Sequence, residues 1–196
     1  MKEKLKTLYE DGALSAEGLL NAVMKGWVTV DEAAQIIGED SAADIVKRAK
    51  LAEISKACNT TIVHGVDLEL DGNIVHFNLS NEDQSNIANL FRVVELGGSS
   101  YPYQSDEGVC RIYTAVEIAQ IYIAAQTHIT TQTTYHNTLK SYVQSLTDVD
   151  EITAVTYGME LPEAYQAEMA EKLSVAEAQM EAIVVRLNQA MTDNVE

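Results

Sequence analysis

The sequence predicts a mainly α-helical protein that carries small β-hairpins. Two features of the composition favour helices, because aromatic residues make up only 6% of the chain and only 2 of its 196 residues are proline. A third observation is local: most segments space their apolar residues as helices do, and few alternate apolar with polar residues. We expect a short three-helix head, a middle region of hairpins and helix, and long amphipathic or coiled-coil-like helices toward the C-terminus.

Charge and cysteine content disfavour several classes of partner. The formal net charge of −17 argues against binding to nucleic-acid phosphates or to anionic lipid surfaces. Cys58 and Cys110 are far apart and form no C-x-x-C motif, which indicates reduced thiols. The segment MKEKLKTLYEDG has no apolar signal core, and no apolar run approaches the length of a membrane span. We expect a protein made in the cytoplasm, with no nucleic-acid and no membrane partner.

Residues 1–38 form the first predicted unit, a head of three brief helices separated by glycines. The first helix ends at Gly12, and Ser15 caps the second. Thr29 and Glu32, three residues apart, have the spacing of a capping box for the third helix. We expect the core of this head to contain an apolar pair and the only tryptophan, wedged between the second and third helices: Leu20, Val23 and Trp27.

The head resembles the XkdX-like short tail proteins of phages and defective prophages. The resemblance is carried by Gly12, Glu17, Leu20, Val23, the GWVT of Gly26 to Thr29, Glu32 and the final IIG. Members of that family are small acidic chains encoded beside tail-fibre and baseplate genes. No catalytic residues are known for them, so the resemblance implies a docking element of a tail and assigns no catalytic residue here.

Residues 39–59 are expected to form a helix that connects the head to the middle region. This helix carries the basic cluster Lys47, Arg48, Lys50 and Lys56. A solvated helix face near a helix C-terminus accounts for four cations. An acidic docking partner is the alternative.

Residues 60–80 have the alternation of a β-hairpin. Asp71-Gly72 predicts a type I′ turn, because both central positions of that turn need positive φ. Asp67 then lies opposite His76, as a surface pair that favours the imidazolium. The same register pairs Val66 with Phe77 and Leu68 with Val75 on one apolar face.

A helix and a second hairpin follow. Ser80 is expected to cap a helix that ends at Gly97-Gly98. Residues 101–104 should then pair with residues 109–113. Thr114 and Glu117 form another capping box, which begins a long helix over residues 114–146.

This middle region is similar to a domain of unknown function that is widespread in tail and fibre-associated proteins of phages and prophages. The likeness rests on HFNLSNEDQSNIANL and on YPY followed by CRIYTAVEIAQIYIAAQTHITTQTTYHNTLKSYV. It covers about residues 60–146. It implies the same setting as the head, a tail-like particle.

The long helix carries a seam with steps of three and four residues that is apolar at its ends and polar in the middle. We expect it to be an oligomerisation seam, with a trimer favoured, since polar layers specify register and oligomeric state. Its residues are Ile121, Ala125, His128, Gln132, Tyr135, Leu139 and Tyr142. A metal site is the alternative, but His128 and His136 are about 12 Å apart along a helix, too far for one chain to chelate one ion with both.

Residues 147–196 are expected to form an acidic loop and then an amphipathic helix that starts near Pro162. We interpret the apolar stripe of this helix as a docking surface for a neighbouring protein, because Ala- and Met-rich stripes are adaptable. Packing against its own chain is the alternative. The stripe contains Tyr165, Met169, Leu173, Met180, Ile183 and Leu187.

No catalytic motif stands out. The chain has no P-loop, G-x-G-x-x-G, H-E-x-x-H or G-x-S-x-G sequence, so we expect no enzyme, no catalytic or metal-binding residue and no cofactor. We expect a structural component of a phage or phage-tail-like particle, at the baseplate or tail-fibre attachment region, with other tail proteins as partners. It would be located in the virion tail after assembly in the bacterial host cytoplasm. The alternative is a tail-fibre assembly chaperone that is absent from the mature particle.

Overall fold

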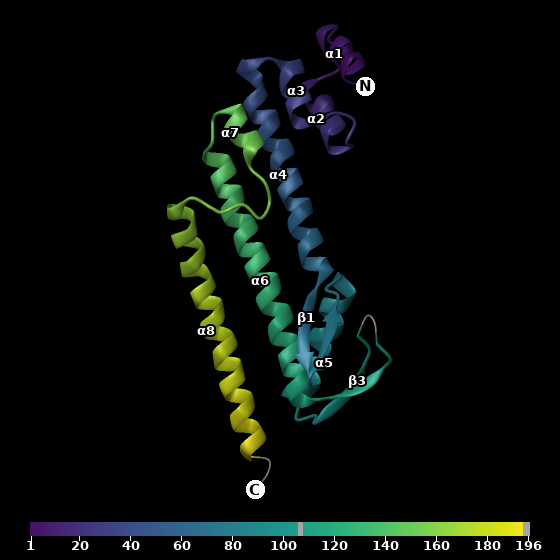
Figure 1. Cartoon of the computed structure of the whole chain (residues 1–196), viewed down its shortest axis with the longest axis vertical. Helices are drawn as coiled ribbons and strands as arrows, with labels where there is room; N and C mark the ends of the chain where they lie inside the picture. The colour runs from purple at the N-terminus through teal and green to yellow at the C-terminus, as the bar shows by residue number, and fades with distance from the viewer. Residues whose placement is uncertain (106–107, 194–196) are drawn as a thin grey trace. The chain divides into compact units, whose positions relative to one another are not determined.

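The computed structural model describes residues 1–105 and 108–193, apart from the side chains of residues 39–42, 187, 188 and 190–193. The described residues form eight helices and four strands, which confirms the predicted mainly α class with two small antiparallel hairpins (Figure 1). The elements are α1 (Lys2–Glu10), α2 (Ala16–Met24), α3 (Val30–Ile37), α4 (Glu39–His64), β1 (Val66–Leu70), β2 (Asn73–Phe77), α5 (Asn81–Glu95), β3 (Ser100–Tyr103), β4 (Arg111–Thr114), α6 (Ala115–Ser145), α7 (Val149–Ala154) and α8 (Glu163–Asp193).

The chain divides into two compact units. The first unit contains Met1–Cys58 and His136–Gln166, and the second contains Asn59–Tyr135 and Ala167–Glu196. The head belongs to the first unit and both hairpins belong to the second. Helices α4, α6 and α8 contribute residues to both units.

The head has a core built from α1, α2, α3 and the loop before α3. Its helices begin as expected: the Ser15 hydroxyl accepts a hydrogen bond from the N–H of Gly18, and Thr29 and Glu32 form the capping box. Six buried residues make the core: Leu5, Leu19, Ala22, Val28, Ala33 and Ile36. The expected core residue Val23 packs against this cluster while partly buried.

The predicted tryptophan plug is wrong. Trp27 is 51% exposed, whereas Val28 beside it is only 5% exposed. The reason lies in the turn that ends α2: Gly26 takes a φ of +69°, and the N–H of Trp27 donates back to the carbonyl of Ala22. After this turn Val28 enters the core and Trp27 stays on the surface. Leu20, the other expected core residue, is half-buried and lies outside the buried cluster.

The first hairpin has the predicted register. Val66 pairs with Phe77, Asp67 with His76 and Leu68 with Val75. Asp71 and Gly72 have φ values of +52° and +77°, as a type I′ turn requires. The expected start at residue 60 is wrong, because α4 continues to His64 and strand β1 begins only at Val66.

Gly65 makes the abrupt change from α4 to β1 possible. It has a φ of +89°, and a Cβ atom there would lie 2.0 Å from the carbonyl oxygen of Phe77. Only glycine tolerates both the backbone conformation and this close approach. The end of α4 is thus held directly against the end of β2.

The second hairpin pairs β3 with β4, with Tyr101 opposite Tyr113. Asp106 and Glu107, between the two strands, lie outside the described residues. Helix α6 begins as predicted, because Thr114 accepts from the N–H of Glu117 while the Glu117 carboxylate accepts from Thr114.

The segment expected to be an acidic loop contains the short helix α7. The carboxylate of Asp148 caps it by accepting a hydrogen bond from the N–H of Glu151. Ile152 is fully buried and anchors this helix. Helix α8 then starts at Glu163, directly after Pro162, as expected.

Candidate functional site

The head presents an aromatic surface. Trp27 and Met24 are 51% and 62% exposed, and the Lys25 ammonium lies 5.0 Å from the centre of the Trp27 ring. A cation at this distance over an aromatic face is attracted to it. We call Met24, Lys25 and Trp27 the head surface. Tryptophan is enriched among the residues that dominate protein-binding surfaces.

The residues of the predicted seam lie on α6, but the chain itself covers several of them. Ile121, Ala125 and Leu139 are at most 1% exposed. The His128 imidazole Nε2 lies 3.1 Å from the carbonyl oxygen of Thr61, near the end of α4. Helix α6 therefore needs no second copy to cover these three apolar side chains.

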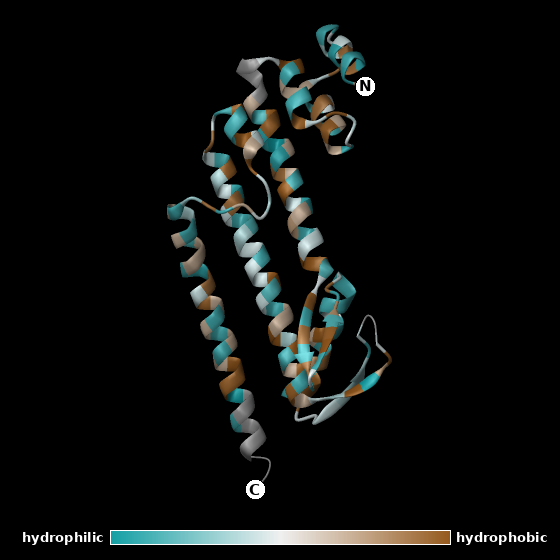
Figure 2. Cartoon of the chain, in the orientation of Figure 1, coloured by the Kyte–Doolittle hydropathy of each residue, from teal (hydrophilic) through white to brown (hydrophobic). Residues whose placement is uncertain are grey.

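The polar middle of α6 borders an open groove in the second unit. The groove has a volume of about 700 Å³ and is lined in part by His128 and Gln132 of α6, Leu68 of β1 and Val184 of α8. His128, Gln132 and Tyr135 are half-buried. Figure 2 shows the middle of α6 largely in white and teal, the colours of weakly and strongly polar residues. This part of the predicted seam is the part that a partner could still contact.

The predicted docking stripe of α8 is half-buried and faces its own chain. Within the second unit, Leu173 and Met180 line a small space of about 20 Å³ together with Thr127 and Thr131 of α6. Met169 and Ile183 are half-buried as well. The side chain of Leu187 lies outside the described residues.

Within the first unit the two predicted interaction sets meet. The rings of Tyr142 and Tyr165 are 5.3 Å apart at an angle of 63°, and the Tyr165 hydroxyl donates to the Ser145 hydroxyl over 3.0 Å. The start of α8 thus packs on the end of α6. For Tyr165 the structure shows the packing on its own chain that the sequence left open.

His76 is held between two acceptors in the first hairpin. Its Nδ1 lies 2.7 Å from the Asp67 carboxylate, and its Nε2 lies 2.8 Å from the carbonyl oxygen of His64. Only the imidazolium can donate from both ring nitrogens at once. The hydrogen bond to Asp67 is the main cause that raises the pKa of His76 above its ordinary value. The expected surface pair is present, with a backbone acceptor that the sequence did not predict.

A second charged network joins the two hairpins to α6. The Arg111 guanidinium donates to Glu117 over 2.8 Å and lies 3.9 Å from both the Asp71 carboxylate and the centre of the Tyr113 ring. Burial alone would raise the pKa of Glu117, but hydrogen bonds from Thr114 and Arg111 lower it below its ordinary value. This carboxylate is therefore a structural anion that holds the start of α6.

A cavity of about 350 Å³, which was not predicted from the sequence, lies between α5 and β3. Asn86 and Asn89 line it from the helix, and Tyr101 and Tyr103 line it from the strand. The available signal was two amides three residues apart on one helix face, followed by the Tyr-Pro-Tyr segment. Recognising it required the packing of β3 on α5, which no local pattern gives.

Two features are absent from the part of the chain that the structure describes: a cluster of metal-ligating side chains and a helix that could span a membrane. No three side chains of the types His, Cys, Asp and Glu lie close enough together there to hold a metal ion. Burial lowers the pKa of His136, the other histidine considered for a metal layer. Within the same part of the chain, no helix combines the length and the apolar character that crossing a bilayer requires.

Comparison with known proteins gives one finding. No curated protein and no solved structure matches the chain. Residues 45–157 match the family described as "Domain of unknown function (DUF4376)", from within α4 to just beyond α7. The match includes the region of residues 60–146 in which the sequence predicted a domain of unknown function, and it leaves the head and α8 outside. Because it covers more than half of the 196 residues, the chain belongs to the DUF4376 family.

Proposed function

We propose that this protein is a structural component of a phage or phage-tail-like particle, at the baseplate or tail-fibre attachment region, where it acts by docking to other tail proteins. No catalytic role, metal or cofactor is part of this proposal. The observation that carries the proposal is the exposure of Trp27, the aromatic residue of the segment that resembles XkdX-like tail proteins.

The other residues of that segment fold the head itself. Gly26 makes the turn, Val28 is buried, and Thr29 and Glu32 cap α3. Trp27 contributes little to this core, and it lies under Lys25 on the surface. An exposed Trp beside an apolar side chain is typical of the few residues that dominate a protein interface. The head surface is therefore the docking element in this proposal.

Self-association, with a trimer favoured, is a second part of the proposal. It is supported by the heptad-like spacing of α6 and by the open groove beside His128 and Gln132. The buried residues Ile121, Ala125 and Leu139 would stay inside each copy. Light scattering of the purified protein tests self-association directly. A mass of one chain, 21.5 kDa, would contradict self-association without affecting the docking role.

The docking role is tested on particles purified from a host that carries the gene. Mass spectrometry should find the protein in the particle at a constant stoichiometry. Trp27→Ala should reduce its incorporation by at least about tenfold, because truncating a central interface Trp costs about 2 kcal/mol or more. The matched control is Ile74→Ala, which removes an apolar side chain that is 79% exposed in the first hairpin and should leave incorporation unchanged.

Two other outcomes count against the proposal in different ways. If the protein is abundant in the cell but absent from particles, the structural role is wrong and the result favours the assembly chaperone. If Trp27→Ala is incorporated as well as the parent, the particle role stands but the head surface is not the docking element.

A further inference from the structure

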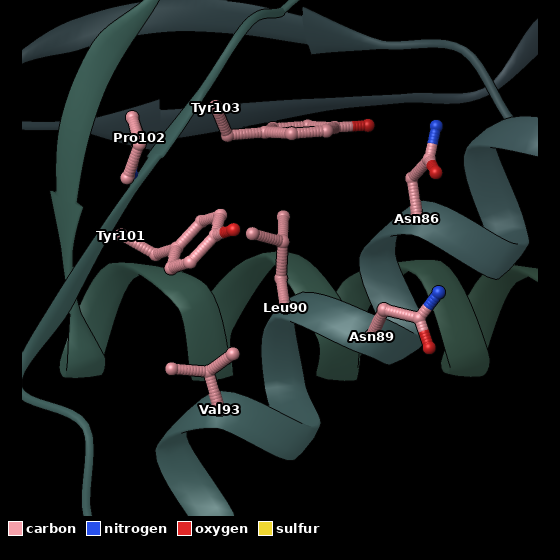
Figure 3. A pocket seen from close by; sticks show the side chains of 7 residues that line it. All are labelled: Asn86, Asn89, Leu90, Val93, Tyr101, Pro102 and Tyr103. Carbon is pink, nitrogen blue, oxygen red and sulfur yellow. The ribbon is translucent and has the colours of Figure 1, made fainter.

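The cavity between α5 and β3 has the features of a ligand site. Figure 3 shows side chains from the helix and from the strand converging on one recess, with Leu90 at its centre. The volume of about 350 Å³ is within the range of small-ligand pockets. The described residues that line the cavity all belong to the second unit, whereas the head surface belongs to the first.

Helix α5 and strand β3 place the residues that line this cavity, of which Asn86, Asn89, Tyr101 and Pro102 are exposed. Asn86, Asn89 and Val93 share one face of α5, and Tyr101 and Tyr103 share one face of β3. Gly98, in the loop between the helix and the strand, turns back onto the end of α5, where a Cβ atom at this position would lie 2.6 Å from the Val93 side chain.

The Tyr103 ring contacts two other rings. It stacks on Phe77 at a centroid distance of 6.5 Å and an angle of 9°, and it meets Tyr113 edge-on at 6.4 Å. Figure 3 shows the ring viewed along its plane, above Leu90, with the hydroxyl directed to the side where Asn86 lies. A ligand would therefore meet an aromatic wall that is already in place.

The lining groups select for a neutral ligand with hydroxyl groups. Among the residues that the structure describes, no charged side chain lines the cavity, although the chain has a net charge of −17. Each carboxamide of Asn86 and Asn89 places an acceptor oxygen beside a donor NH₂ group, and each tyrosine adds a hydroxyl. In the described part of the chain neither of these two amides has a protein hydrogen-bond partner.

We propose that this cavity binds a neutral saccharide, one or two sugar rings in size. A sugar ring has an apolar C–H face and a rim of adjacent hydroxyls that both donate and accept hydrogen bonds. Tyr101, which is 45% exposed, and the fixed ring of Tyr103 offer apolar surface to the C–H faces. Asn86 and Asn89 offer paired donors and acceptors to the hydroxyl rim.

A proline-rich peptide fits the same walls less well. Aromatic grooves bind such peptides in the extended polyproline II form, whose backbone presents mainly carbonyl acceptors. The two amides and two hydroxyls here supply acceptors as well as donors. A ligand that only accepts hydrogen bonds would leave the acceptors of the cavity unused. A neutral proline-rich decapeptide is therefore the competing probe in the test.

The test is a titration of the purified protein with candidate ligands. Isothermal titration calorimetry and ligand-observed NMR measure the binding. The probes are maltose, cellobiose, lactose and N,N′-diacetylchitobiose, with the proline-rich decapeptide alongside. We expect at least one saccharide to bind. Tyr101→Ala should weaken that binding at least about tenfold through lost ring contact, and Asn86→Ala about fivefold through lost hydrogen bonds.

Two control variants separate the cavity from its surroundings. Ile112→Ala removes a 67% exposed side chain from the same hairpin. Asn81→Ala removes an amide from the same helix. Neither residue lines the cavity. Both controls should bind as the parent does. The proposal is overturned if no saccharide binds, if binding survives both Tyr101→Ala and Asn86→Ala in folded protein, or if only the peptide binds.

Discussion

The head of the chain and the hairpin region of the second unit are stabilised by different kinds of contact. The head joins three short helices through apolar side chains, and its polar contacts are mainly local helix caps. The hairpin region instead combines rings such as Phe77 and Tyr113 with charged networks around His76 and Arg111. The head should therefore respond to changes of apolar volume, and the hairpin region to changes of backbone geometry and protonation.

The largest expected effect is on the backbone of the hairpin region. Gly65→Ala should lower the free energy of unfolding of the second unit by about 4 kcal/mol, from positive-φ strain and from the clash with Phe77. Hydrogen exchange along β1 and β2 measures it. Gly72→Ala is the matched control: Gly72 has a similar φ of +77° but no atom within 4 Å of its Cβ position, so the loss should be about 1–2 kcal/mol. Equal losses in both variants would show that Gly65 is not in close contact with Phe77.

A core truncation should have the next largest effect, in the head. Leu19 is fully buried, so Leu19→Ala should cost about 3 kcal/mol through lost burial and the cavity it leaves. Amide exchange in α1, α2 and α3 should accelerate while β1 and β2 keep the protection of the parent. Leu20→Ala, at the half-buried neighbouring position, should cost clearly less. If Leu20→Ala lowered the free energy of unfolding more than Leu19→Ala, Leu20 would be a core residue, as the sequence predicted.

Protonation should change the hairpin and leave the head unaffected. The folded-state pKa of His76 is raised, so its contribution to stability is complete below the unfolded-state pKa of about 6.5 and is lost as the pH rises through the folded-state value. After correction for intrinsic exchange rates, β1 and β2 should be better protected at pH 6 than at pH 8. NMR titration of the imidazole should give a pKa above 6.5, and Asp67→Asn should lower it. A His76 pKa at or below 6.5 in the parent would contradict the double-donor geometry.

The smallest effect on stability should come from the most exposed aromatic residue of the head. Trp27→Ala should change the free energy of unfolding by less than about 0.5 kcal/mol, since it removes surface contacts only. Thermal denaturation of the parent and the variant measures this. A loss near 3 kcal/mol would mean that Trp27 is buried in solution, and the head surface would then lose its central residue.

What the sequence could predict follows the range of the interactions involved. The caps at Ser15, Thr29 and Thr114 and the turn at Asp71-Gly72 depend on residues three or four positions apart, and all are present as expected. Whether Trp27 would be buried or exposed was not predictable from the local pattern, because this depends on the direction of the backbone after Gly26. The alternation of residues 60–64 suggested a strand, yet these residues continue α4.

The candidate sites were harder to predict than the elements. The spacing of the α6 seam and of the α8 stripe showed which residues share a helix face, but not what covers that face. In the structure Tyr142 meets Tyr165, so part of each stripe covers the other. The cavity between α5 and β3 depends on two elements that come together only in the folded second unit.

The packing of α3 beside α7 has a consequence for the order of folding. The contacts among α1, α2 and α3 all join residues within the first 37 positions, so they carry less loop-closure entropy than the contact with α7 and can form earlier. The contact between α3 and α7 must wait until α4, both hairpins and α6 have been synthesised. During translation the head can therefore form its core early, while the face of α3 that α7 later contacts remains open. A nascent chain would expose that face to chaperones for most of its synthesis.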